Sequence, residues 1–301
     1  MASDFNTRNI VTKDFTWTSN LTFTWNKEKI TRLATPDAEY VTNGDNGLVL
    51  MKGEAVNSWY HYKLNGVWKT SEAADAAVFG AKPGDLKIDV PGMIHNGEGS
   101  YSKWVERENS ETGEIERVLE TYTAENPYVI SSNDYQVLGH KNPDWTMGFK
   151  NTFTYKNFDL SIYLYWRWGQ TIKYDMLGNY DPTGAKNFPT YFDYWTQETG
   201  DQDHYFPALN SSRDITTYTG YYALSYVDGS FFKIKNITLG YTLPQKWAKS
   251  VGIENFRVYA TITNPLVIQK SDLLKNYDPE MDGGIDYPLT KQFVFGVNLT
   301  F

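Results

Sequence analysis

The sequence predicts an all-β fold: an antiparallel transmembrane β-barrel segment of about seven spanning strands, with long extracellular loops. Three observations support this fold class. Apolar and polar residues alternate with a period of two over several segments, so each predicted strand has one apolar and one polar face. Aromatic residues make up 16% of the 301 residues and lie near the ends of the apolar faces. Tight turns and long irregular connections alternate between these segments, as in outer-membrane barrels.

The last segment of the chain, residues 291–301 (KQFVFGVNLTF), shows the alternation most clearly. Residues 15–25 (FTWTSNLTFTW) alternate in the same way, and Ser19 is the only interruption of their apolar face. Aromatic residues gather at the two interfaces of a membrane. We therefore expect lipid-side girdles that contain Trp17, Trp25, Trp166, Trp168, Phe293 and Phe301.

A hairpin is predicted at residues 145–168, where two alternating segments are joined by the two-residue turn Lys156-Asn157. One strand contains a phase error, because Phe232 and Ile234 alternate out of step with Ile237. A β-bulge near Asn236 would restore the register. The spanning strands are predicted at 5–11, 15–25, 145–155, 158–168, 231–243, 256–263 and 291–301.

Three segments without sustained alternation are predicted to be outer loops, at about 26–144, 169–229 and 265–290. The short turns, at 12–14, 156–157 and 244–255, should lie on the opposite side of the membrane. This parity requires an even number of crossings within 26–144, and we expect none, with the strand-like segment 58–64 standing above the membrane. An open sheet would leave unpaired edges in lipid, so we expect the strands to be part of a larger barrel.

Composition excludes several classes of protein and site. The absence of cysteine excludes disulfides and thiolate metal sites. A balance of 28 basic against 36 acidic residues argues against nucleic acid as a partner. The four histidines show no ligand spacing, so no metal site is expected. The N-terminus (MASDFNTRN) lacks the pattern of a signal peptide, which we interpret as a mature form, a fragment or an engineered length of chain.

Several short motifs resemble one family in the order in which that family carries them. The most specific is residues 233–244 (KIKNITLGYTLP), and the last is residues 295–301 (FGVNLTF). Others are 13–17 (KDFTW), 60–68 (YHYKLNGVW), 82–85 (KPGD), 139–145 (GHKNPDW), 155–160 (YKNFDL), 257–259 (RVY) and 277–280 (YDPE). Together they cover nearly the whole chain, which resembles the C-terminal third of SusC/RagA-type TonB-dependent outer-membrane transporters.

The resemblance implies an active transporter that imports oligosaccharides or peptides across the outer membrane of a Gram-negative bacterium. It implies a SusD-like surface lipoprotein as a lid, and the TonB complex acting through a plug domain. The plug and the N-terminal strands are absent from residues 1–301, which would supply barrel wall, outer loops and an assembly signal for the barrel-assembly machinery (Gly296, Leu299 and Phe301). No enzymatic activity and no cofactor are implied. One departure is residues 85–92 (DLKIDVPG), which lack the acidic, glycine-rich loop of many members.

Candidate ligand contacts are aromatic and polar residues near the outer rim, because sugars stack on such rings and share hydrogen bonds with polar groups. The alternative is that the loop rings pack against each other or against a lid. The candidates are Tyr165, Arg167, Tyr180, Tyr194, Trp195 and Tyr221. Separately, Asp278, Glu280 and Asp282 imitate the start of a calcium loop, but Leu289 stands where its bidentate glutamate belongs, so an acidic loop is the preferred interpretation.

A second hypothesis is a soluble all-β carbohydrate-binding module or glycosidase, supported by the same alternation and by the tyrosine-rich segments. No carboxylate pair or nucleophile motif stands out for catalysis. The two hypotheses differ in what covers the apolar face. A soluble sandwich packs that face on a second sheet about 10 Å away, whereas a membrane wall turns it toward lipid.

Overall fold

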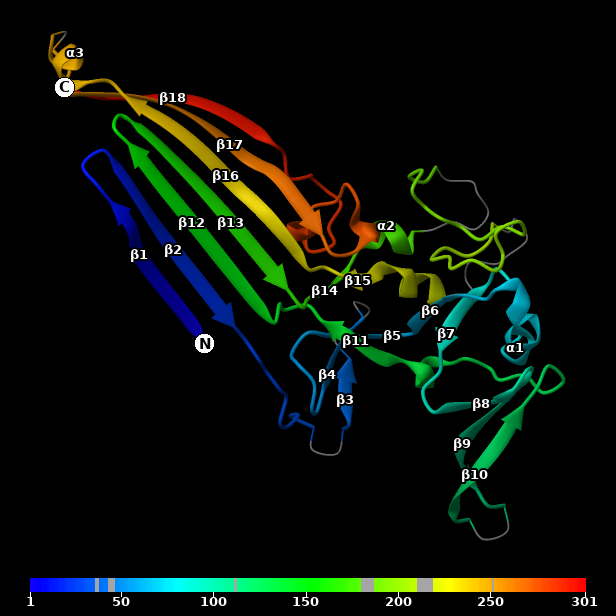
Figure 1. Cartoon of the computed structure of the whole chain (residues 1–301). Helices are drawn as coiled ribbons and strands as arrows, with labels where there is room; N and C mark the ends of the chain where they lie inside the picture. Colours follow the sequence, from blue (N-terminus) through cyan, green and yellow to red (C-terminus); the bar gives the residue numbers. More distant parts are fainter. Residues whose placement is uncertain (36–37, 43–46, 111–112, 180–186, 210–218, 251) are drawn as a thin grey trace.

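The computed structural model describes residues 1–35, 38–42, 47–110, 113–179, 187–209, 219–250 and 252–301. Figure 1 shows two regions. A long, curved sheet forms one of them, and small sheets and short helices gather beyond one end of it. None of the helices within the described ranges is long and apolar enough to cross a membrane.

The long sheet contains seven antiparallel strands, which confirms the predicted fold class. Across the sheet they are β1 (Ala2–Val11), β2 (Phe15–Trp25), β12 (Trp145–Tyr155), β13 (Phe158–Trp168), β16 (Phe231–Thr242), β17 (Asn255–Gln269) and β18 (Gln292–Thr300). Each pairs with the next along the chain. Because β2 pairs directly with β12, the segment 26–144 adds no strand to this sheet. This pairing is the one required if the segment 26–144 does not cross the membrane.

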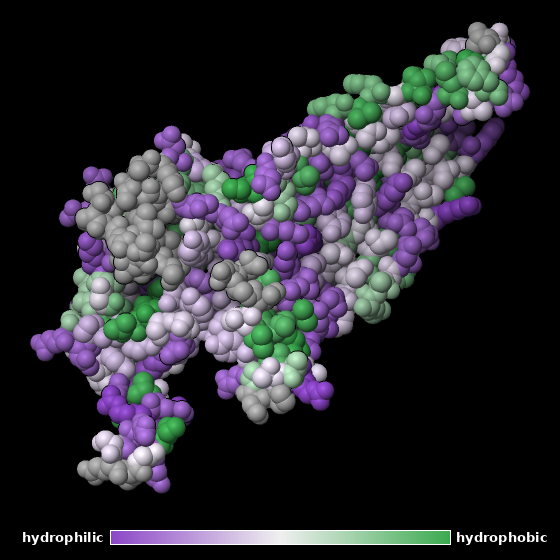
Figure 2. Space-filling model, turned by 180° about the vertical axis from the view of Figure 1, so that it is seen from behind, coloured by the Kyte–Doolittle hydropathy of each residue, from purple (hydrophilic) through white to green (hydrophobic). Residues whose placement is uncertain are grey.

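The register gives the sheet one apolar and one polar face. Leu21 and Phe149 are neighbours on the first face, whereas Asn20, Lys150 and Tyr163 are neighbours on the second. The polar face is hollowed in Figure 2, where purple and pale atoms line the trough of the sheet and green atoms lie along its margins. We call the polar face the inner face and the apolar face the outer face.

The expected bulge near Asn236 is confirmed. The register between β13 and β16 shifts at Lys235, so that Tyr163 pairs with Asn236 and Leu164 pairs with Ile234. One extra residue on β16 returns the side chains before the bulge to the outer face. When Lys235 is treated as the extra residue, the apolar residues on both sides of the bulge lie on the same face of the sheet.

Strand β17 continues to Gln269, beyond its predicted end at residue 263. A second irregularity lies opposite Lys235, where Asn264 adopts a left-handed conformation with φ of 52°. Leu266 and Ile268 then resume the outer-face alternation, opposite β16. The connection predicted at 265–290 therefore begins later, because the irregularity interrupts the sequence pattern without ending the strand.

Ser19, the polar interruption of the outer face, has polar partners. Its hydroxyl donates to Asn151 Oδ1 at 2.7 Å and accepts from Asn9 Nδ2 at 2.6 Å. Trp17 Nε1 donates to the same Asn151 oxygen at 3.0 Å. Polar groups on an apolar surface are costly unless they bond to each other, and here four side chains do so.

The segment 26–144 forms three small sheets. The first contains β11 (Gln136–His140), β5 (Ser58–His61), β4 (Leu48–Met51) and β3 (Tyr40–Thr42), and the second contains β6 (Lys63–Val67) and β7 (Leu86–Asp89). The third contains β10 (Ile115–Tyr122), β9 (Ser100–Glu108) and β8 (Met93–Gly97). The expected single strand at 58–64 is wrong, because the chain leaves one sheet after His61 and enters another at Lys63.

Short helices and one two-stranded sheet complete the fold. They are η2 (Thr70–Glu72), α1 (Ala73–Val78), η3 (Ser132–Asp134), α2 (Asp175–Gly178), η5 (Thr219–Ser225), α3 (Gln245–Lys249), η6 (Asp272–Leu274) and η7 (Pro279–Met281), with β14 (Thr171–Lys173) paired to β15 (Tyr226–Asp228). The buried apolar cluster lies among these connections rather than on the long sheet. It includes Leu86, Ile172, Phe206, Leu224 and Leu274, each at most 2% exposed.

The tight turns and the long connections lie at opposite ends of the long sheet (Figure 1). The β12–β13 turn and α3, which connects β16 to β17, lie at one end, and the small sheets lie at the other. The short turns and the long connections therefore lie at opposite ends of the sheet, as predicted. Which end faces the cell exterior stays a prediction.

Candidate functional site

The connection between β17 and β18 folds against the inner face of the sheet and is held there by ion pairs. Lys233 Nζ on β16 lies 2.5 Å from Asp278 Oδ2 and 2.7 Å from Glu280 Oε2. Lys235 pairs with the other oxygen of Glu280, and Arg167 Nη2 on β13 lies 2.9 Å from Asp282 Oδ1. We call these six side chains the anchor cluster. Lys233 is completely buried within it.

Local geometry explains why the three carboxylates reach the wall together. Asp278 accepts a hydrogen bond from Glu280 N at 3.1 Å and so begins the short helix η7. Asp282 ends that helix in a left-handed conformation. Next, Gly283 donates from its backbone to the Tyr277 hydroxyl at 2.8 Å. A side chain at Gly283 would collide with the backbone carbonyl of Lys173, so only glycine fits there.

The charge state of Glu280 follows from these contacts. Burial alone would raise the pKa of its carboxyl group, but hydrogen bonds from Lys233 and Lys235 outweigh burial and hold the pKa below its ordinary value. The carboxylate is therefore ionised at neutral pH. The imitation of a calcium loop is explained in the same way, since amino and guanidinium groups occupy the oxygens that a cation would need. Within the described ranges no group of three or more His, Asp or Glu residues could hold a metal ion.

Two cavities flank this connection on the inner face. Cavity A has a volume of about 670 Å³ and lies over the bulge of β16. Its lining is polar and aromatic, and the Lys235 amino group lies 5.0 Å from the centre of the Tyr165 ring. The lining residues are Tyr163, Tyr165, Lys235, Asn236, Thr263, Asn264, Glu280, Met281 and Leu289.

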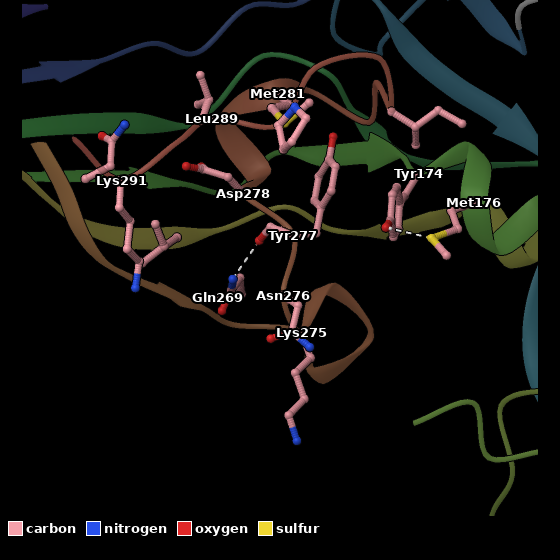
Figure 3. A pocket seen from close by; sticks show the side chains of 14 residues that line it. Tyr174, Met176, Gln269, Lys275, Asn276, Tyr277, Asp278, Met281, Leu289 and Lys291 are labelled. Carbon is pink, nitrogen blue, oxygen red and sulfur yellow. Dashed lines mark hydrogen bonds between the residues drawn. The ribbon is translucent and has the colours of Figure 1, made fainter. Parts of the chain in front are cut away.

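Cavity B has a volume of about 600 Å³ and lies between the connection and β17 (Figure 3). Its walls are mainly apolar, with Val267, Met281 and Leu289 among them. Lys275 and Lys291 stand at its rim, and in Figure 3 their side chains extend toward the same side. The cavities share three lining residues, so they form adjoining spaces rather than separate sites.

The predicted ligand contacts divide between these cavities and other places. Tyr165 lines cavity A. Arg167 lies on the same face of β13, but its guanidinium is paired with Asp282, which gives it a structural contact that sequence reasoning did not foresee. These two residues are the only members of the predicted set placed near the anchor cluster by the described contacts.

The other predicted contacts lie in the segment 169–229 or outside the description. Tyr194 is 42% exposed, and its backbone forms an isolated parallel β-bridge with that of Phe206. Trp195 donates its indole N–H to Gly200 O at 3.1 Å. Trp195 also packs against the buried cluster, which favours the alternative that loop rings pack the loop itself. Tyr180 lies outside the described residues, and Tyr221 lies on η5 with a side chain that is also outside the description.

The predicted girdle residues lie on the outer face. Trp25 pairs with Trp145, whose ring stacks on Trp168 at 5.9 Å between centroids, and Trp166 packs on Phe232 at 4.7 Å. Trp17 also carries the hydrogen bond to Asn151 described above. Phe293 and Phe301 are 69% and 81% exposed. Their role at a membrane interface stays a prediction.

One residue of the predicted assembly signal has a packing role. Gly296 on β18 pairs with Tyr259 on β17, and the Tyr259 ring lies directly over it. A side chain at position 296 would occupy the space of that ring. Leu299 and Phe301 lie on the outer face, with their exposure at 45% and 81%. Recognition by assembly machinery stays a prediction.

Sequence reasoning missed Tyr163, Lys233, Lys275 and Lys291. A signal for Lys233 was present, because Lys233 and Lys235 alternate at the same period of two as Asp278, Glu280 and Asp282. Two segments that carry opposite charges at the same spacing can pair with each other, so this pattern indicates that residues 233–235 and 278–282 lie side by side. No comparable signal exists for the two rim lysines, which depend on how the connection folds.

No protein-family model matches the sequence. TonB-dependent receptor P3 of Formosa agariphila is 26% identical over 318 residues, which cover 98% of this chain and 28% of that receptor. TonB-dependent receptor SusC of Bacteroides thetaiotaomicron is 28% identical over 313 residues, which cover 100% of this chain and 26% of that receptor. The chain therefore spans less than a third of the length of these relatives.

Solved structures of similar fold are described as the RagAB peptide transporter and the RagAB peptide importer. The transporter structure matches with a TM-score of 0.69 at 22% identity, over 98% of this chain and 28% of that one. The importer in its "closed-closed" state matches with a TM-score of 0.68 at 21% identity, over 100% of this chain and 29% of that one. At this level of identity the match establishes the fold.

Proposed function

The chain is related over nearly its whole length to the C-terminal part of SusC/RagA-type TonB-dependent receptors, and from this premise we propose that it forms barrel wall and outer loops of an outer-membrane importer. The observation that carries the proposal is the seven-stranded sheet, with an apolar outer face and a polar inner face that holds two cavities. Relatives are named as receptors and transporters, so binding and passage rather than chemical conversion is the activity proposed.

The proposed cargo is an oligosaccharide or a peptide that crosses the outer membrane of a Gram-negative bacterium. The description of the RagAB structures as peptide transporters supports the peptide, and SusC-type relatives support the same class of import machinery. A SusD-like surface lipoprotein would close over the small sheets, and the TonB complex would act through a plug that lies outside residues 1–301. The inner face would then line the path of the cargo.

The outer-face assignment is testable with two neighbouring residues of β13. Ile162 lies on the outer face opposite Ile237, and Ser161 lies on the inner face opposite Thr238. A lysine on a lipid-facing position near the middle of a membrane costs about 2–4 kcal/mol, whereas a lysine facing a polar interior costs little. In a complete barrel that includes residues 1–301, we expect Ile162→Lys to lower the fraction that folds into lipid nanodiscs, read by far-UV circular dichroism and protease resistance, and Ser161→Lys to leave it unchanged.

The soluble alternative gives a different result in the same experiment. A soluble carbohydrate-binding module would be a monodisperse, β-rich monomer in buffer without lipid, as measured by sedimentation and circular dichroism. The membrane proposal requires β-structure to form only with lipid or detergent. Equal effects of the two lysine substitutions would also contradict it, because the two faces would then meet the same environment.

A further inference from the structure

Cavity B combines an apolar interior with a cationic rim. Lys275 and Lys291 are both exposed, and neither makes an ion pair or a side-chain hydrogen bond within the described part of the chain. The third charged residue of the lining, Asp278, is paired with Lys233. The rim is therefore locally positive on a chain whose formal net charge is −8. A rim of this kind attracts anions.

The hydroxyl groups of the cavity are already engaged, which disfavours a neutral sugar there. Tyr277 donates its hydroxyl to Gly284 O at 2.9 Å, and the Tyr174 hydroxyl donates to Met176 Sδ at 3.1 Å. Both tyrosines are buried, and their rings pack on each other at 4.2 Å between centroids. The amide groups of Asn264 and Gln269 in the lining also donate to backbone carbonyls, of Thr290 and Tyr277. A sugar would bring many hydroxyls to groups that are already bonded, and unpaired polar groups are costly to bury.

We propose that cavity B binds a carboxylate carried on an apolar chain, with Lys275 and Lys291 as the contacts for the carboxylate and the apolar walls as the contacts for the chain. The inference deepens the proposed function and rests on it, since the cavity opens on the face that would line the cargo path. A volume of about 600 Å³ is within the range of small-molecule sites. The carboxylate could belong to the end of a peptide or to an acyl chain.

The test uses a complete barrel that includes residues 1–301, because an open sheet would leave unpaired edges in lipid. The barrel is held in zwitterionic lipid nanodiscs, and binding is measured by isothermal titration calorimetry. The probes are N-acetyl-dileucine, its C-terminal amide, hexanoate and maltotriose. Two exposed charge contacts together give about tenfold tighter binding of the acid than of the amide, and this ratio should fall as salt is raised. In the variant Lys275→Gln/Lys291→Gln, acid and amide should bind within about twofold of each other.

Two further variants separate charge from fold. Lys246→Gln/Lys249→Gln removes the same charge from exposed positions of α3, at the other end of the sheet, and should leave both affinities unchanged. Leu289→Ser changes an apolar wall residue and should weaken acid and amide by the same factor. Hexanoate binding that depends on the two lysines would identify an acyl chain as sufficient, and selective binding of the peptide acid would identify a peptide end. Either result supports the proposal.

Several outcomes would overturn the proposal. Equal binding of acid and amide, no effect of Lys275→Gln/Lys291→Gln, or displacement of the acid by maltotriose would each do so. Insertion is followed separately by circular dichroism and protease resistance. A complete barrel that fails to insert contradicts the proposed function and this inference together, whereas a barrel that inserts and ignores the charge of the probe contradicts the inference alone.

Discussion

Replacing Lys233 tests whether the anchor cluster holds the β17–β18 connection on the inner face. The ammonium group is completely buried and serves both Asp278 and Glu280. The substitution Lys233→Met keeps a side chain of nearly the same length but leaves Asp278 without its cation and Glu280 with Lys235 alone. Removing one member of a buried ion pair costs about 3–5 kcal/mol, because the remaining charge stays desolvated.

We expect this free energy to appear as local opening of the connection, because the strands of the sheet keep their backbone pairing. An opening cost lowered by 3–5 kcal/mol corresponds to amide exchange faster by roughly a hundred- to several-thousand-fold. The measurement is hydrogen–deuterium exchange of residues 277–284 in nanodiscs. The Gly283 amide, which donates to the buried Tyr277 hydroxyl, should report it most directly.

A matched control is Lys270→Met. Lys270 pairs with Asp228 at 2.5 Å, but its side chain is 50% exposed, and exposed pairs contribute about 0–1 kcal/mol. We expect exchange in 277–284 to stay within about threefold of the unchanged protein. The double variant Lys233→Met/Asp278→Asn should recover much of the protection, since it removes the carboxylate left without a cation and keeps the pair of Lys235 with Glu280. Equal effects of Lys233→Met and Lys270→Met would show that the position of the connection does not depend on the buried ammonium group.

Three further predictions concern other parts of the chain. Lowering the pH should loosen the connection, because the folded pKa of Glu280 lies below its ordinary value. The stabilisation by the ionised Glu280 carboxylate is complete above about pH 4.5 and is lost as the pH falls through the folded pKa. Hydrogen–deuterium exchange of residues 277–284 across a pH series measures this loss. Burial and the nearby Lys173 lower the pKa of His61 to about 4, so the stability of its region should fall between about pH 6.5 and pH 4, and His61→Phe should remove that step from pH-dependent thermal unfolding. Gly296→Ala should reduce the protease-resistant fraction by displacing the Tyr259 ring, and Gly296→Ala/Tyr259→Ala should restore part of it, whereas equal losses in the two variants would contradict the packing role.

The long sheet could be predicted from the sequence because its determinants are local. Alternation places each side chain, and the two-residue turn at Lys156 joins β12 to β13 with Lys156 in a left-handed conformation that such turns require. Even the bulge was visible as a phase error before Ile237.

The candidate site was less predictable because it depends on contacts between distant segments. Arg167 was expected to face a ligand, and it does lie on the inner face, but Asp282 reaches it from far along the chain. The split of 58–64 into two strands depends likewise on partners outside it, since β5 pairs with β11 and β6 pairs with β7. The alternation of residues within a strand predicts on which face of the sheet each side chain lies, but it does not predict which other segment packs on that face.

The anchor cluster and the rim of cavity B use positive charge in two different ways. Lys233 is buried and paired with both Asp278 and Glu280, so its charge fixes the position of the connection. Lys275 and Lys291 belong to the same connection, are exposed and face a cavity that is largely apolar. The anchor cluster keeps both rim lysines at cavity B, because Lys275 and Lys291 belong to the connection that the cluster holds on the inner face. Loosening the anchor with Lys233→Met should therefore weaken binding of N-acetyl-dileucine at cavity B without a change in either rim lysine, and unchanged binding in that variant would show that the rim acts independently of the anchor.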